Sequence, residues 1–172
     1  MEGAINGRVS DHCAIAVFHS PQYHRFMEAY EFIEGYTEVV AHFGVWPSFH
    51  DGEVHRIVLD RMRRDSSGAH VPSLEIDVRG WIMGPEVTKK GYYVLHHDAV
   101  VSFLFEDIFD LELEGFSQQN VLSSRDLSLS EGPTGTGKVL HVELEHCYLF
   151  AGEFSARKAS VVGVRSWNGD AV

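Results

Sequence analysis

Four stretches of the sequence alternate apolar and polar side chains with a period of two residues. In the last of them, Leu140, Val142 and Leu144 are separated by single polar residues. Successive side chains of a β-strand point to opposite faces, so such a stretch predicts a strand with one face toward a core and one toward water. This pattern is typical of antiparallel sheets. The four stretches are 74–82, 110–114, 126–130 and 140–148.

Three further stretches are strand-like, although their alternation is less regular. They are 54–62, 92–106 and 154–164, and within the second of these 100–105 is almost continuously apolar. A continuous apolar run of that length is typical of a central strand that is covered on both faces. Short connections rich in glycine, serine and aspartate separate the predicted strands.

The segment before the strands has a helical period instead. Ser20 and Pro21 form a strong helix start, since serine is a good N-cap and proline suits the first helical position. Apolar residues then recur at spacings of three and four, and Gly44 suits the left-handed position that ends a helix. Gly35 interrupts the pattern, which leaves either one long helix with a weak point or two short helices. We predict one main helix over about 21–43.

Together these patterns predict an α+β fold in a single domain that spans residues 1–172. Its main part is an antiparallel sheet of about six to eight strands over about 53–165, accompanied by the N-terminal helix. A chain of this length can bury a sizeable apolar core without disulfides or metals.

The charge of the chain limits its partners. With 25 acidic and 14 basic residues, the formal net charge is −11 at pH 7. Such a field repels nucleic acid and attracts cationic partners, although acidity also serves solubility alone. No apolar stretch approaches the ~20 residues of a membrane-spanning helix. The two cysteines, Cys13 and Cys147, have no metal-ligand spacing. We expect a cytoplasmic protein with no nucleic-acid or membrane partner.

The segment Gly132–Lys138 has the glycine and lysine spacing of a phosphate-binding P-loop. Val139 stands where a P-loop has serine or threonine. The residues that follow alternate like a strand, whereas a P-loop opens onto a helix whose N-terminus holds the phosphate. We therefore interpret the segment as a glycine-rich hairpin loop and expect no cofactor.

The densest group of potential metal ligands comprises His50, Asp51, Glu53 and His55. In extended backbone the last three project to one side, and imidazole with carboxylates suits zinc, manganese or iron. Histidines and carboxylates at 96–98 or at 141–145 could complete such a site if those strands were neighbours.

A structural interpretation competes with the metal site, and we favour it. Phe49 would fill the core, while the Asp51 carboxylate would cap a turn made with Gly52. Replacing His50 or Asp51 with alanine would then lower stability by about 1–3 kcal/mol through lost buried hydrogen bonds. The predicted turn motif consists of Trp46, Pro47, Phe49, His50, Asp51 and Glu53.

Two segments resemble a known bacterial family. Gly44-Val-Trp-Pro-Ser-Phe-His-Asp-Gly-Glu-Val54, followed by Leu59-Asp60-Arg61, resembles a pattern of the immunity protein 50 family, the companions of secreted polymorphic toxins. Leu111-Glu-Leu-Glu-Gly-Phe-Ser-Gln-Gln-Asn-Val-Leu122 is similar to the same family. Gly52 stands where the family has alanine, a change that a turn tolerates. The resemblance implies a binding role and brings no catalytic residues.

An immunity protein needs a rigid surface complementary to its toxin and no chemistry of its own. Many such toxins are basic nucleases, toward which an acidic domain gains electrostatic steering. We therefore predict a non-enzymatic binding protein that occludes a protein partner, with a basic toxin as the expected kind. The alternative is a metal-dependent enzyme or metal-binding protein that uses His50, Asp51, Glu53 and His55. A third interpretation is a self-associating module with an exposed sheet edge, and the sequence leaves the oligomeric state open.

Overall fold

The computed structural model describes residues 27–132, 135–147 and 149–169. Within them all strand pairs are antiparallel, in the order β1-β2-β3-β6-β5-β4. The α+β class with a mainly antiparallel sheet is therefore confirmed. In chain order the elements are the 3-10 helix η1 (Ala29–Phe32), the α-helix α1 (Tyr36–Phe43), β1 (Glu53–Asp60), β2 (Ser73–Val87), β3 (Tyr93–Glu114), β4 (Leu122–Glu131), β5 (Lys138–His146) and β6 (Ala151–Ser166).

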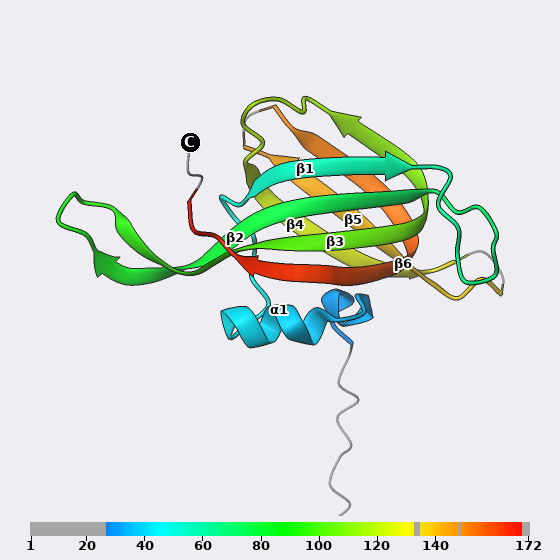
Figure 1. Ribbon diagram of the computed structural model, residues 1–172, viewed down its shortest axis with the longest axis horizontal. Coiled ribbons are helices and arrows are strands. Elements are labelled where there is room, and N and C mark those ends of the chain that lie inside the picture. The colour runs from blue at the N-terminus through cyan, green and yellow to red at the C-terminus, as the bar shows by residue number, and fades with distance from the viewer. Residues whose placement is uncertain (1–26, 133–134, 148, 170–172) are drawn as a thin grey trace, which may run out of the picture.

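The sheet curls into two layers because β3 and β6 are long and bend midway (Figure 1). The front layer contains β1, β2, the first part of β3 and the last part of β6. The back layer contains the last part of β3, the first part of β6, β5 and β4. In β3 the bend falls at Asp107 and Asp110, which both have positive φ, next to a β-bulge. Bulges of this kind bend a strand and let one sheet turn a corner.

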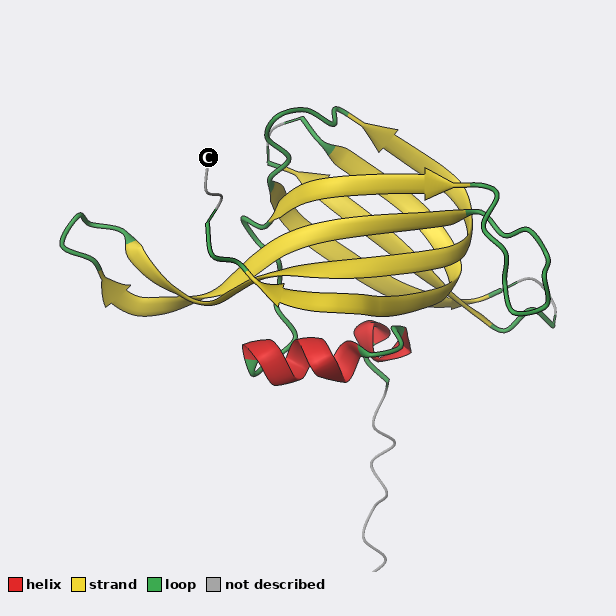
Figure 2. Ribbon diagram, viewed as in Figure 1, coloured by secondary structure: helices red, strands yellow, loops and turns green. Residues whose placement is uncertain are grey.

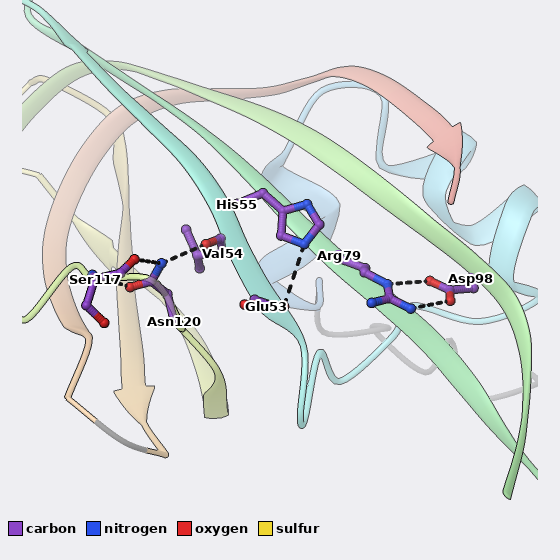
Figure 3. A network of polar contacts seen from close by, with 7 residues as sticks. All are labelled: Glu53, Val54, His55, Arg79, Asp98, Ser117 and Asn120. Carbon is purple, nitrogen blue, oxygen red and sulfur yellow. Dashed lines mark hydrogen bonds and ion pairs between the residues drawn. The ribbon is translucent and has the colours of Figure 1, made fainter. Parts of the chain in front are cut away.

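The edge strands β1 and β4 meet at their N-terminal ends, which closes the curl there. The Val54 N–H donates to the Asn120 carbonyl at 2.9 Å, and the Leu122 N–H donates to the Gly52 carbonyl at 2.8 Å. The Asn120 side chain is buried and donates to the Val54 carbonyl at 3.2 Å, while its Oδ1 accepts from the Ser117 N–H at 2.7 Å (Figure 3). We call these contacts between 51–54 and 117–122 the seam.

The helices lie against the open side of the curled sheet (Figure 2). Ile33, Val39 and Phe43 pack into the apolar core between the layers. The helix expected over 21–43 is instead two short elements within the described residues, and Ser20, Pro21 and the rest of 20–26 lie outside them. The break has two causes. Gly35 adopts a φ of 79°, and the backbone of Glu34 bonds to β6 in extended conformation.

Two other expectations have clear outcomes. The predicted strands at 92–106 and 110–114 are one continuous strand, because the backbone bends at the bulge without leaving the sheet. Strands β4 and β5 pair as an antiparallel hairpin up to Glu131 and Lys138, and beyond them the Gly132 N–H donates to the Gly137 carbonyl at 2.7 Å. The interpretation of the P-loop-like segment as a hairpin connection is confirmed. In the described ranges, no helix has the length and apolar character needed to cross a membrane.

Candidate functional site

The predicted turn motif lies at the seam. The Gly52 N–H donates to the Phe49 carbonyl at 2.9 Å, and the Asp51 N–H donates to the Leu122 carbonyl at 3.0 Å. Phe49 and Asp51 have φ values of 56° and 60°, an unfavourable conformation for residues with a side chain. Phe49 fills the core as expected, and it lies on Gly80, where an added Cβ would come within 2.8 Å of its ring. The motif therefore joins β1 to the core and to the start of β4.

The expectation that the Asp51 carboxylate caps this turn is wrong. Backbone groups make the bonds of the turn, together with Ser48 Oγ, which accepts from the His50 N–H at 3.2 Å. The Asp51 carboxylate instead lies 3.1 Å from His50 Nδ1, and the two side chains are 46% and 66% exposed. Neither side chain makes a buried hydrogen bond within the described residues, so we now expect both to contribute less to stability than the alternation and turn signals predicted.

Trp46 and Pro47 anchor the turn to the helical side of the core. Pro47 is fully buried, and the Trp46 ring stacks on Tyr30 with centroids 4.9 Å apart. The Arg125 guanidinium projects from β4 between two aromatic rings, 5.2 Å from Trp46 and 5.0 Å from Phe49. Burial lowers the pKa of Arg125 to about 10, which still leaves it charged at neutral pH. These contacts are packing contacts and place no reactive group at the surface.

The candidate metal ligands separate into two pairs. His50 lies beside Asp51, and His55 Nε2 lies 3.8 Å from Glu53 Oε2 (Figure 3). In the described sheet β1 pairs along its length with β2 and meets only the start of β4, so the histidines and carboxylates at 96–98 on β3 and at 141–145 on β5 lie on strands that do not pair with it. Among the residues that the structure describes, no three His, Cys, Asp or Glu side chains gather closely enough to hold a metal ion.

A row of four acidic residues crosses the outer face of the back layer. In the strand register Glu112 of β3 is opposite Glu153 of β6, Glu153 is opposite Glu143 of β5, and Glu143 is opposite Asp126 of β4. Directly opposite residues share a face, with Cβ atoms about 4.5–5.5 Å apart. All four are exposed. We call Asp126, Glu143, Glu153 and Glu112 the acidic row.

The acidic row borders an open groove of about 740 Å³ on the same face. Strands β3, β5 and β6 supply most of its wall, with Ser123 from β4. Its lining contains no lysine or arginine. The glutamates that line it are Glu112, Glu114, Glu143, Glu145 and Glu153. We call this feature the acidic groove.

The carboxylates of the row and groove have few partners of opposite charge. Glu153 Oε1 lies 3.4 Å from His141 Nε2, and Glu145 Oε2 accepts a long hydrogen bond of 3.5 Å from Ser123 Oγ. Within the described part of the chain, no lysine or arginine forms an ion pair with any of them. Like charges that are directly opposite destabilise a sheet, so this face raises the free energy of the folded chain. It also concentrates negative potential where a cation can approach.

The sequence contained a partial signal for this site. The alternation in 110–114 and 140–148 predicts that Glu112, Glu143 and their acidic neighbours lie on the solvent side of two strands. Consecutive solvent-facing positions on two predicted strands are acidic, which indicates an acidic face. The row itself depends on register and on β6 lying between β3 and β5, and neither follows from local alternation.

Comparison of the chain with protein-family models, with curated proteins and with solved structures finds no match in any of the three. The function is therefore inferred from the acidic row and the acidic groove themselves.

Proposed function

We propose that this protein is a non-enzymatic binding protein whose acidic groove receives a basic segment of a protein partner. The acidic row supports this proposal most directly. Four carboxylates in register repel one another in the free protein, and a cationic partner would remove that repulsion while adding attraction across the interface. The formal net charge of −11 would steer such a partner toward the chain over a longer range.

The construction of the face suits binding of a partner without rearrangement. Within the back layer β5 and β6 are each paired on both sides, so the backbone that carries Glu143 and Glu153 is held in place. A surface that is already ordered loses little conformational entropy when it binds. Rigid complementarity is the property that an occluding protein requires.

We further propose that the partner is a basic toxin, neutralised by contact. The two segments that resemble the immunity protein 50 family, 44–54 and 111–122, meet at the seam. The second of them contributes Glu112 and Glu114 to the acidic groove. The resemblance and the electrostatics thus favour the same kind of partner and the same face.

The experiment is co-expression of the full chain with the product of the neighbouring gene, followed by copurification and a growth assay. The proposal predicts that the two proteins copurify and that toxicity of the neighbour is relieved. The groove variant Glu143→Gln/Glu153→Gln should bind about 10–100-fold more weakly. Its matched control is Glu38→Gln/Glu131→Gln, which removes the same charge from exposed positions outside the groove.

Two outcomes would contradict the proposal in different ways. If the neighbour neither copurifies nor loses toxicity, the immunity-type role is wrong. If binding occurs and the groove variant binds as tightly as its control, the acidic groove is not the binding face.

A further inference from the structure

A hairpin arm projects beyond the body of the sheet at the β2–β3 connection (Figure 1, green, at the left). It comprises residues 82–96, with Met83 opposite Leu95 and Val87 opposite Tyr93. β1 pairs with β2 only as far as Arg79, and β6 pairs with β3 only from Ala99 onward. The arm is therefore a two-stranded ribbon, a structure that is marginally stable in water unless something covers it.

One face of the arm is apolar and exposed. Met83, Val87, Tyr93 and Leu95 share this face, because they form two cross-strand pairs and the last two alternate along β3. Their exposed fractions are 52%, 57%, 56% and 39%, and neighbouring Tyr92 is 70% exposed. Contiguous exposed apolar side chains on a protein surface mark interaction sites.

The charge of the arm differs from that of the rest of the chain. Lys89 and Lys90 occupy its tip, are exposed, and form no ion pair with a described residue. The acidic groove has the opposite charge. Two exposed apolar residues also flank the end of the groove where Glu114 pairs with Ala151, namely Phe116 and Leu149, which are 53% and 71% exposed.

We propose that the arm of one copy of this chain docks in the acidic groove of a second copy. Lys89 and Lys90 would approach the glutamates, while the aromatic and aliphatic side chains of the arm would contact Phe116 and Leu149. A second copy supplies both the lysines that match the glutamates and an apolar face that matches Phe116 and Leu149, whereas a nucleic acid brings only further negative charge to an acidic groove.

The arm does not dock in the groove of its own chain, because the arm and the groove lie at opposite ends of β3. β3 begins in the arm at Tyr93 and borders the groove at Glu112. These residues are separated by roughly 60 Å of strand length, and the arm points away from the body (Figure 1). The contact is therefore between different patches of two copies. Such heterologous contacts produce rings or open chains. A basic partner in the groove would compete with the arm and disperse the assembly.

Sedimentation velocity of the full chain, over a range of concentrations and at low and high salt, tests the proposal. We expect the average mass to rise above that of the monomer with concentration and to fall as salt is added. Lys89→Glu/Lys90→Glu should weaken self-association at least about tenfold. The matched control Lys138→Glu/Lys158→Glu makes the same charge change at exposed positions of β5 and β6 and should associate like the wild type.

A charge exchange makes the test specific to the groove. Glu143→Lys/Glu153→Lys should also fail to self-associate, and mixing it with Lys89→Glu/Lys90→Glu should restore association. A monomer at every concentration would overturn the proposal, as would a mixture that stays monomeric. If Met83→Ser/Leu95→Ser alone dissociates an assembly that both charge variants retain, the arms pair with each other and docking in the groove is wrong. These outcomes concern self-association alone. The binding of a basic partner to the monomer is tested separately, by the copurification experiment described above.

Discussion

The outer faces of the two layers both carry acidic residues, but only the front layer neutralises them. On the front layer Asp77 is buried, accepts a hydrogen bond of 2.6 Å from Ser102 Oγ, and lies 3.4 Å from Arg165 and 3.9 Å from Arg56. On the back layer no member of the acidic row forms an ion pair with an arginine or lysine of the described residues. Both faces arise from the same alternation in the sequence.

A second front-layer pair strengthens the contrast. Arg79 donates to both oxygens of Asp98, at 2.9 and 2.7 Å (Figure 3). Its guanidinium lies 5.2 Å from the Trp81 ring and 4.8 Å from the Trp167 ring. Paired and stacked arginines of this kind hold strands in register. The difference between the layers indicates that an acidic residue helps to hold strands together where the neighbouring strand supplies a cation, and that its charge stays unneutralised where no cation is supplied.

The largest expected effect is on the front layer. Asp77→Ala should lower the free energy of unfolding by about 2–4 kcal/mol, because Arg165, Arg56 and Ser102 lose a common, largely desolvated acceptor. Urea denaturation measures this loss. Glu143→Ala, on the back layer, is the comparison and should cause no loss, because Glu143 is exposed and lies opposite Glu153 and Asp126 in the strand register. Equal destabilisation by the two substitutions would remove the distinction between the layers.

A substitution in the middle of the acidic row should have the opposite effect and raise the free energy of unfolding. Glu153→Gln removes a charge that is opposite Glu112 on one side and Glu143 on the other, so it should stabilise the free protein by about 0.5–1 kcal/mol. Thermal unfolding followed by circular dichroism measures the gain. A loss of stability would indicate that the contact between His141 and Glu153 outweighs the repulsion.

Salt should change the stability of the wild type and of an acidic-row variant by different amounts, both smaller than the effects above. Raising the ionic strength screens exposed like charges, so the wild type should gain stability, by about a few tenths of a kcal/mol. Glu143→Gln/Glu153→Gln should gain less, because the repulsion is already reduced. An equal response of the two proteins to salt would show that the acidic row does not strain the fold.

The smallest effect should occur at the turn. His50→Ala and Asp51→Asn should each change the free energy of unfolding by less than about 0.5 kcal/mol, because both side chains are largely exposed. Asparagine is chosen because it tolerates the left-handed backbone at this position. If chemical denaturation shows that the free energy of unfolding falls by about 1–3 kcal/mol, the buried hydrogen bonds predicted from the sequence would be supported instead.

The sequence predicts the elements of this fold better than their arrangement. Alternation identifies the strands because burial on one face acts residue by residue, and Gly35 indicates where the helical segment breaks. The bend at Asp107 cannot be read in the same way, because a bulge keeps a strand in its sheet while disturbing the period. The acidic row depends on residues from four strands that meet only after β6 is placed between β3 and β5. Pairing between strands that are distant in the sequence determines which strands become neighbours and in which register. Local sequence patterns do not reveal that pairing.

The seam has a consequence for the order of folding. Asn120 and Val54 bond to each other although they are 66 residues apart in the chain. Contacts between such distant residues require a large loop to close, and they slow folding in proportion to the entropy lost. We expect the hairpins β2–β3 and β4–β5 to form first and the seam to close last. Asn120→Ser would then accelerate unfolding while leaving the folding rate almost unchanged, which chevron kinetics would reveal. Until the seam closes, the backbone groups of Gly52 and Val54 lack their partners in 120–122 and are open to other chains, so slow closure would favour aggregation during folding.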